Sequence, residues 1–188
     1  MSAITEDLEV RRAAWSDIGD HLYRLRDEAS RPGVKVIDLG VRSGNSTAAF
    51  LSAAEAHGGH VWSVDISWAP LPEFWYQSGF WSFTIGDDCD PFIVNCTPDE
   101  VDIVFIDTSH HFQHTLDELT LYVPKVKPGG VVLLHDTELE TPFDAPPDDP
   151  PFPVAEAIRK YTAERGLTVE WVTGSYGLGV IHVSEAVL

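Results

Sequence analysis

Five aspartate positions recur at the ends of predicted strands, where carboxylates can do chemistry. Each closes or follows an apolar run, and they are Asp38, Asp65, Asp87 with Asp88, Asp107 and Asp136. Because the carboxyl ends of parallel strands meet at one edge of a sheet, we expect these side chains to lie together. Carboxylates accept hydrogen bonds from sugar hydroxyls and hold divalent cations. Aspartates that only solvate a surface would be as frequent at strand starts, so the pattern predicts a ligand-binding edge.

Four histidines accompany the last two of these aspartates. They are His110, His111 and His114, which follow Asp107, and His135, which precedes Asp136. His110 could be a general base or cap the following helix, whereas His111 and His114 are expected to cap that helix or face solvent. Two carboxylates suffice for Mg²⁺, but coordination by His135 would favour Mn²⁺, Fe²⁺ or Zn²⁺. Asp136 could instead bond the backbone amides of a turn without any metal.

The turn after the first predicted strand contains Gly40 and Gly44 but lacks the three glycines of a dinucleotide fingerprint. Arg42 and Asn45 stand within it, so a diphosphate would fit badly. Asp65, 21 residues after Gly44, is placed to accept hydrogen bonds from both vicinal hydroxyls of a ribose. The turn therefore indicates a nucleoside with a cationic or zwitterionic tail. The alternative is an ordinary strand-to-helix turn.

The elements that must carry these residues alternate between strands and helices. Apolar runs predict strands at 34–39, 60–66, 81–85, 101–107, 131–134, 168–172 and 178–183, and helices are predicted at 45–57, 112–123 and 154–165. An N-terminal amphipathic helix is predicted at 13–30 from the helical spacing of Trp15, Ile18, Leu22 and Leu25. The alternation predicts an α/β fold with a doubly wound, mostly parallel seven-stranded sheet and one antiparallel edge strand.

Two segments between these elements have an unusual composition. Seven aromatic residues gather at 68–83, where they are expected mainly to pack over the sheet; the alternative is that some, Trp68 above all, flank a ligand. Segment 139–153 holds six of the 13 prolines and predicts an irregular loop. Because that loop directly follows Asp136, it could form a lid, and the alternative is an untethered surface loop.

The overall composition excludes several classes of partner. The chain has 188 residues with 12 Lys+Arg against 30 Asp+Glu, a net charge of −18 that would repel a nucleic-acid backbone. No apolar run approaches the roughly 20 residues that span a bilayer, and the N-terminus lacks a secretory pattern. Two cysteines, Cys89 and Cys96, cannot build a disulfide framework. These features predict a single cytoplasmic domain, 1–188, without nucleic-acid or membrane partners.

Five motifs, taken in order, make the sequence resemble a known enzyme family. They are IDLGVRSGNST at 37–47, VDI at 64–66, GDD at 86–88, FIDTSHHFQHTLDEL at 105–119 and KPGGVVLLHDT at 127–137. The set resembles the class I S-adenosylmethionine-dependent methyltransferases. Within them it is most similar to the branch of catechol O-methyltransferase-like, macrolide-sugar and cephalosporin-pathway O-methyltransferases. The resemblance runs from about 34 to 137 and implies a Rossmann-like methyltransferase fold; the ordered set is specific, although no single motif is.

The resemblance also implies site residues. S-adenosylmethionine would be bound by Asp38, Gly40, Gly44, Asn45, Ser46, Asp65, Ile66, Asp87, Asp88 and Asp107. Asp107, His135 and Asp136 would hold a divalent metal, Mg²⁺ by preference, and His110 and Asp107 would be catalytic, His110 as the general base. The sequence departs from the family where Asp38 replaces the commoner Glu and where His135 replaces an often acidic residue. The implied function is metal-assisted O-methylation of a small hydroxylated molecule, a sugar or natural product, by a homo-oligomeric enzyme.

Two other functions compete with this one. The first is a non-haem metal oxygenase or hydrolase that uses His110, His135 and Asp136 as a facial triad. It leaves the glycine turn and Asp65 without a role. The second is a module that binds the cofactor but has lost catalysis.

Overall fold

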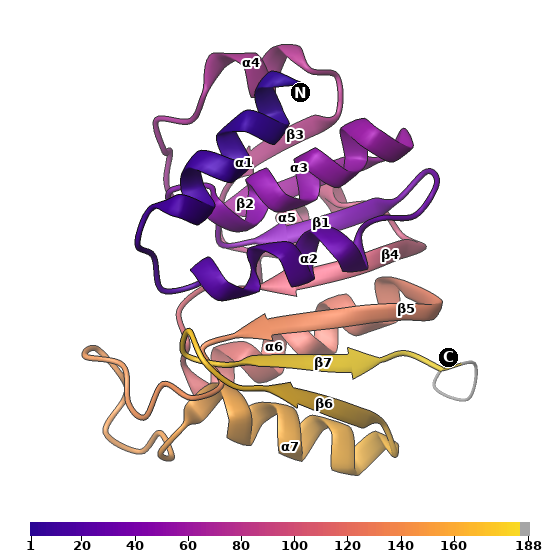
Figure 1. Cartoon of the computed structure of the whole chain (residues 1–188). Coiled ribbons are helices and arrows are strands. Elements are labelled where there is room, and N and C mark those ends of the chain that lie inside the picture. The colour runs from indigo at the N-terminus through magenta and orange to yellow at the C-terminus, as the bar shows by residue number, and fades with distance from the viewer. Residues whose placement is uncertain (185–188) are drawn as a thin grey trace.

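The computed structural model describes residues 1–184 and contains a seven-stranded sheet in the order β3-β2-β1-β4-β5-β7-β6 (Figure 1). The strands are β1 (Lys35–Leu39), β2 (His60–Asp65), β3 (Trp81–Ile85), β4 (Val101–Ile106), β5 (Val126–His135), β6 (Thr168–Val172) and β7 (Leu178–His182). Strand β7 is antiparallel to its neighbours β5 and β6, and the other pairs are parallel. The predicted fold class is confirmed, with the antiparallel strand one place in from the edge strand β6. Residues 185–188 of the predicted domain lie outside the described residues.

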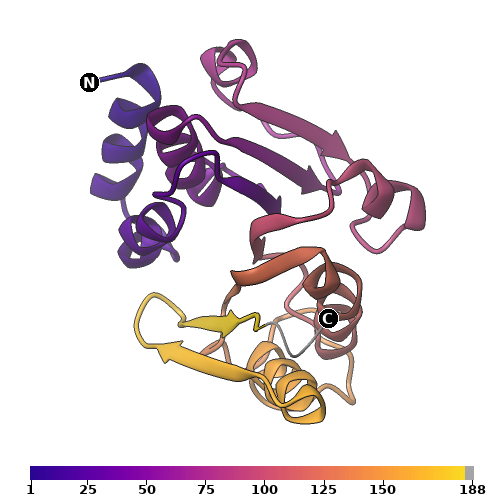
Figure 2. The ribbon, with the colours of Figure 1, turned by 90° about the vertical axis from the view of Figure 1, so that its right-hand side faces the viewer.

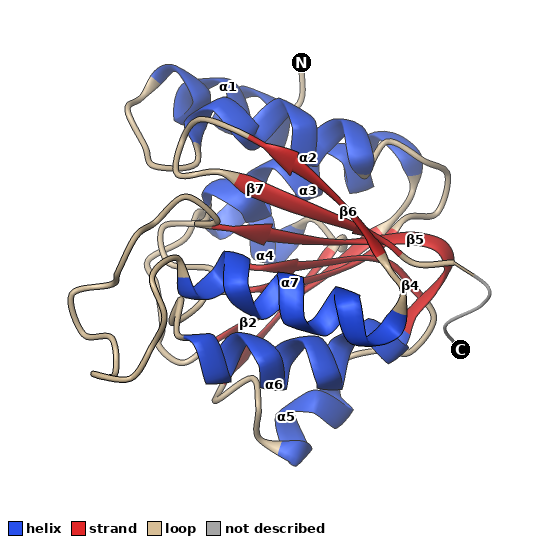
Figure 3. Ribbon diagram, turned by 90° about the horizontal axis from the view of Figure 1, so that it is seen from below, coloured by secondary structure: helices blue, strands red, loops and turns tan. Residues whose placement is uncertain are grey.

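Helices cover both faces of the sheet. They are α1 (Ala3–Ala13), α2 (Leu22–Glu28), α3 (Asn45–His57), α4 (Glu73–Gln77), α5 (Pro91–Cys96), α6 (Phe112–Tyr122) and α7 (Pro153–Arg165), with short 3₁₀ turns η1 (Gly19–His21) and η2 (Val123–Lys125). Helices α1 to α3 lie on one face, and α5 to α7 on the other (Figure 2, Figure 3). Each face has its own apolar core, which is why the central strands are apolar at nearly every position. Within residues 1–184, no helix combines the length and the apolar character that crossing a membrane requires.

The predicted helix at 13–30 is wrong in its first half. Helix α1 ends at Ala13, a bend follows, and regular helix resumes only at η1 and α2. Trp15, predicted on the buried face, is 90% exposed, whereas Ile18, Leu22 and Leu25 are buried. The apolar spacing therefore held for the second half only. In the bend, the Asp17 carboxylate accepts the Ile18 backbone N–H, a local bond that competes with helix.

Two short helices lie where the sequence predicted no regular element. Helix α5 is capped by Asp90, whose carboxylate accepts the Phe92 N–H. Pro91 occupies the first position of the helix. Helix α4 buries Trp75 against the core that α1 to α3 share. Most of the aromatic segment thus packs on the sheet, as predicted, although Trp68 stays exposed.

The strand register brings the predicted site residues into one row. Leu39 pairs with Val64 on one side and with Ile106 on the other, and Ile106 pairs with Leu134. The residues that follow these positions are Gly40, Asp65, Asp107 and His135. These four residues, which are up to about a hundred positions apart in sequence, therefore lie together at the carboxyl edge of the sheet.

Candidate active site

Asp38 lies inside β1 and is fully buried. Its carboxylate accepts hydrogen bonds from Ser46 Oγ (3.0 Å), Thr47 Oγ1 (2.6 Å) and Ser63 Oγ (2.8 Å). Burial raises the pKa of Asp38 to about 6, although these hydroxyl bonds oppose the shift. Asp38 thus joins the first turn of α3 to β1 and β2. The contact of Asp38 and Ser46 with the cofactor stays a prediction, and in this structure the two side chains are bonded to each other.

Glycine is required at both positions of the first turn, but a side chain would collide with a different neighbour at each. Both have positive φ, +85° at Gly40 and +84° at Gly44. A Cβ at Gly40 would collide with the Asp107 carbonyl, so this residue permits β1 and β4 to close one wall of a cavity. A Cβ at Gly44 would fall 2.7 Å from the Trp75 ring. Gly44 therefore makes room for α4 packing, and its contact with the cofactor stays a prediction.

Six of the residues predicted to bind the cofactor line one cavity of about 500 Å³ at this edge. They are Gly40, Asp65, Ile66, Asp87, Asp88 and Asp107. The remaining lining residues, which were not predicted to bind a cofactor, are Arg42, Ser67, Gly86, Thr108, Ser109 and His114. The volume lies within the range of ordinary small-molecule sites, about 300–1,000 Å³. The structure thus assembles the cavity from the ends of β1 to β4, and the binding roles stay predictions.

The Asp65 carboxylate is already engaged by the turn that it faces. One oxygen accepts the backbone N–H groups of Val41 (2.9 Å) and Arg42 (2.8 Å), and the other accepts the N–H (2.9 Å) and hydroxyl (3.2 Å) of Ser67. An ionised carboxylate has about four acceptor positions, so all are occupied. A ribose hydroxyl would have to replace a donor, and the rotatable Ser67 hydroxyl is the one that can leave without moving backbone.

Two histidines and two aspartates meet at the ends of β4 and β5; we call Asp107, His110, His135 and Asp136 the corner. His110 Nε2 lies 3.1 Å from Asp107 Oδ1 and 2.9 Å from Asp136 Oδ2. His135 Nδ1 lies 3.4 Å and 3.2 Å from the same two oxygens. His110 and Asp136 both have left-handed backbone, with φ of 59° and 62°, a strained conformation that the surrounding contacts must maintain. The predicted metal residues and the predicted base are therefore in direct contact.

The corner holds protons on its imidazoles. Burial by itself lowers the pKa of His110 and of His135, but the close Asp107 and Asp136 carboxylates outweigh burial and raise the two pKa values to about 9 and about 10. Burial likewise opposes ionisation of Asp107 and Asp136, and the imidazoles nevertheless hold the pKa of both carboxyls below the ordinary value. The two carboxylates thus favour the protonated form of both imidazoles, and a bound cation would compete with those protons.

His135 is oriented by a carbonyl that the sequence did not predict. Its Nε2 lies 2.8 Å from Ser175 O in the turn between β6 and β7, and donates to it. Its Nδ1 is buried without a well-aligned hydrogen-bond partner and faces the Asp107 and Asp136 carboxylates. One atom from each of these three residues lies within 4.8 Å of the others. A buried nitrogen facing two carboxylates fits a divalent cation, and the carbonyl behind it is the usual outer partner of a metal-binding histidine.

A second cavity, of about 460 Å³, opens on the other side of the corner. Its lining residues are Trp15, Ser16, Asp17, Arg42, Ser43, Asn45, His110, Asp136, Leu139 and Tyr176. Asn45, predicted to bind the cofactor, therefore belongs to this cavity. Arg42 lines both cavities, and its guanidinium pairs with Asp17 at 2.6 Å. Sequence reasoning missed Trp15 and Tyr176 because neither lies in a motif.

Histidines 111 and 114 do not simply face solvent. His111 Nε2 lies 3.4 Å from Asp144 in the proline-rich segment, and the Phe112 N–H donates to Asp149 of the same segment at 3.0 Å. Residues 139–152 contain no helix or strand, as predicted, but they are bonded to the start of α6. The alternative of an untethered loop is therefore wrong, whereas the lid stays a prediction. Hydrogen bonds with Asp88 and Cys89 raise the pKa of His114 to about 11.

Comparisons with known proteins identify the family and the fold of the chain. A family model described as a methyltransferase domain matches residues 37–137. No curated protein matches the chain. Among solved structures, a Corynebacterium glutamicum protein is 12% identical with a TM-score of 0.70, over 98% of this chain and 91% of that one. The O-methyltransferase TomG of Streptomyces achromogenes, involved in tomaymycin synthesis and solved with S-adenosylmethionine, is 15% identical with a TM-score of 0.66, over 98% and 91%.

A third similar structure contains a metal. MycE, a methyltransferase of the mycinamycin biosynthetic pathway solved with Mg, S-adenosylhomocysteine and mycinamycin VI, is 16% identical with a TM-score of 0.68. The match covers 98% of this chain but 54% of MycE. At these identities the three structures establish the shared fold.

Proposed function

The chain belongs to the methyltransferase-domain family, and on that premise we propose that it methylates a hydroxyl group of a small molecule, with S-adenosylmethionine as donor and a divalent metal at the corner. One observation carries the proposal: two cavities of ligand size meet at the corner, one lined by Asp107 and the other by His110 and Asp136. Methyl transfer by direct attack requires donor and acceptor side by side. Such positioning supplies about 7–11 kcal/mol in well-oriented systems.

The cavity of about 500 Å³ is the proposed donor side. Asp65 would accept the ribose hydroxyls once Ser67 Oγ turns away, and Asp87 or Asp88 would accept from the adenine amine. When bound, the donor supplies the methyl group on a sulfonium cation. The carboxylates at this edge favour that positive charge. TomG, whose structure contains S-adenosylmethionine, has the same fold, which supports the assignment.

The cavity of about 460 Å³ is the proposed acceptor side. Trp15 is largely exposed and Tyr176 about half exposed, and both supply flat apolar walls that suit a sugar ring or an aromatic natural product. His110 borders this cavity, and its Nε2 would accept the hydroxyl proton. While Asp107 and Asp136 bond to it, that atom keeps its own proton, so His110 is a base only when those carboxylates have another partner.

Asp107, Asp136 and His135 Nδ1 form the donor set that fits a divalent cation. When bound, such a cation lowers the pKa of a coordinated hydroxyl and stabilises the alkoxide. His135 is held for this role by Ser175 O, and the two oxygen donors suit Mg²⁺. The oxygenase or hydrolase hypothesis assigns nothing to the donor-side cavity, and no observation favours it.

Location and assembly are part of the same proposal. Both cysteines are free thiols, which suits the reducing cytoplasm. The net charge of −18 and the two cavities favour a small-molecule substrate over nucleic acid. We also propose homo-oligomerisation, which sedimentation of the purified chain would test.

The deciding experiment measures cofactor binding and methyl transfer separately. Calorimetry with S-adenosylhomocysteine should show binding by the wild-type chain and weaker binding by Asp65→Asn. Methyl transfer to a panel of glycosides and catechols should require added Mg²⁺. Binding without transfer to any acceptor would favour the module that has lost catalysis. Absence of S-adenosylhomocysteine binding would refute the proposal.

A further inference from the structure

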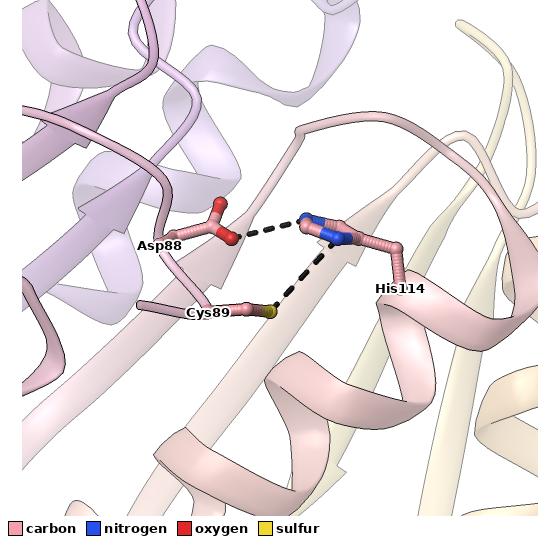
Figure 4. Close-up of side chains that lie close together, drawn as sticks. All are labelled: Asp88, Cys89 and His114. Atoms are coloured by element: carbon pink, nitrogen blue, oxygen red, sulfur yellow. Dashed lines mark hydrogen bonds and ion pairs between the residues drawn. The ribbon is translucent and has the colours of Figure 1, made fainter. Parts of the chain in front are cut away.

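A second cluster of metal-binding side chains lies across the donor-side cavity from the corner and shares no residue with it. Asp88 and Cys89 stand in the turn after β3, and His114 stands in the first turn of α6 (Figure 4). His114 Nε2 lies 3.0 Å from Asp88 Oδ1, and His114 Nδ1 lies 3.9 Å from Cys89 Sγ. One atom from each of the three residues lies within 4.8 Å of the others.

This cluster contains one buried carboxylate oxygen that lacks a partner, Glu118 Oε2. The only close donor to Asp88 Oδ1 among the described residues is His114 Nε2, at 3.0 Å and poorly aligned for a hydrogen bond. The Glu118 side chain is completely buried, and its other oxygen accepts from Thr108 Oγ1 at 2.7 Å. A poorly satisfied carboxylate oxygen in a buried place costs free energy, and a cation bound beside these carboxylates, the imidazole and the thiol would offset that cost.

We propose that Asp88, Cys89 and His114 form a second metal site, which takes a borderline-soft divalent cation such as Zn²⁺. The donor set of one thiolate, one imidazole and one carboxylate is the combination that Zn²⁺ accepts, and it leaves a fourth position open. Tetrahedral Zn²⁺ holds sulfur and nitrogen ligands roughly 3.5 Å apart. The observed 3.9 Å between Cys89 Sγ and His114 Nδ1 needs little adjustment.

Glu118 explains how the imidazole can serve such an ion. A metal takes one ring nitrogen, and the other N–H then requires an acceptor. With Nδ1 directed at the ion beside Cys89, the Nε2 proton can be donated to Glu118 Oε1, now 3.7 Å away, while Asp88 turns its carboxylate to the cation. The site thus offers one carboxylate for the metal and one for the imidazole. Glu118 is the positioning residue.

The two sites differ in their donor atoms, which spectroscopy of a bound metal can distinguish. The corner supplies oxygen and nitrogen only, whereas this cluster supplies sulfur. The chain contains two cysteines, and the other, Cys96, is exposed at the end of α5. In a Cys96→Ser chain, any thiolate bound to a metal must therefore be Cys89.

The test is a titration of the reduced, metal-free Cys96→Ser chain with Co²⁺, a spectroscopic substitute for Zn²⁺. We expect a thiolate-to-cobalt charge-transfer band in the near ultraviolet, which added Zn²⁺ abolishes. Adding His114→Gln should weaken Co²⁺ binding more than about 100-fold, and Glu118→Gln about 10–100-fold, the usual cost of losing an outer partner. Adding Asp107→Asn should leave the band unchanged, because the corner holds no sulfur.

The result that overturns the proposal is a Cys96→Ser chain that shows no such band. A band that persists at the same Co²⁺ affinity after His114→Gln also overturns it. Neither measurement involves methyl transfer, so the second metal site and the proposed function can fail independently.

Discussion

Asp38 and Asp136 are the same residue type near the same edge of one sheet, yet the structure gives them opposite surroundings. Three hydroxyl groups donate to the Asp38 carboxylate, which is fully buried. Asp136 faces two imidazoles and opens onto a cavity. A carboxylate whose acceptor positions are filled by fixed neighbours holds the fold together. One that shares ionisable partners beside a cavity is available for chemistry.

The largest expected effect is on activity at the corner. His110→Ala and Asp136→Ala should each lower kcat/KM about 10²–10⁴-fold, the usual contribution of a general base or of a group acting with it. The midpoint of urea unfolding should change little for His110→Ala, whose side chain is partly exposed, and should fall for Asp136→Ala, whose buried carboxylate pairs with two imidazoles. His111→Ala is the matched control, since His111 lines neither cavity. Equal losses in all three variants would contradict the assignment of His110 and Asp136.

For Asp38→Asn we expect the larger effect on stability rather than on activity. The amide cannot accept all three hydroxyl bonds, so the free energy of unfolding should fall by about 1–3 kcal/mol. Urea denaturation monitored by tryptophan fluorescence measures this. Asp99→Asn serves as the control, because its carboxylate is largely exposed and, within residues 1–184, pairs only with Lys125. If Asp38→Asn were as stable as wild type, the structural role of Asp38 would be wrong.

The pH dependence of stability should separate the same two regions. Since the pKa of Asp38 is about 6 in the folded state and 3.8 in the unfolded state, the folded state binds the proton more tightly between these values. This contribution to stability is complete below pH 3.8 and is lost as pH rises through about 6. Asp107 and Asp136, whose pKa values are lowered, act in the reverse direction and lose their contribution at low pH.

A comparison of variants isolates the Asp38 contribution. The stability difference between wild type and Asp38→Asn should be larger at pH 5 than at pH 7, measured by urea unfolding in both buffers. The same difference for Asp136→Asn should shrink, or stay constant, on going to pH 5. A difference for Asp38→Asn that grows with rising pH would contradict the raised pKa.

The smallest effect is expected in the proline-rich segment. Asp149 accepts the Phe112 N–H at the start of α6, so Asp149→Ala should cost about 1 kcal/mol of stability, as loss of a helix cap does. Cleavage within 139–153 should become faster under limited proteolysis, read by mass spectrometry. The control is Asp148→Ala, because the Asp148 side chain has no hydrogen bond or ion pair among the described residues. This variant should leave both measurements unchanged.

Several features of the fold and site followed from local pattern. The predicted bounds of 45–57 and 81–85 match α3 and β3, because apolar period and terminal glycines are local signals. The aspartates at the ends of β2 and β4 were predicted to meet and do line one cavity. The helix at 13–30 failed because four apolar positions cannot show that a bend at 14–18 separates two helices.

The sequence by itself determined the order of the strands along the chain, the apolar faces and which residue types stand at the strand ends, since these depend on neighbours in the chain. Only the tertiary structure decided what each side chain does there. Asp38 turns inward because three hydroxyls from α3 and β2 donate hydrogen bonds to it. Position 44 requires glycine because a larger side chain would collide with the Trp75 ring. His135 is oriented by Ser175, 40 residues away, and Trp15 reaches the acceptor side through a bend. Such pairings depend on sheet register and packing, which no local pattern contains.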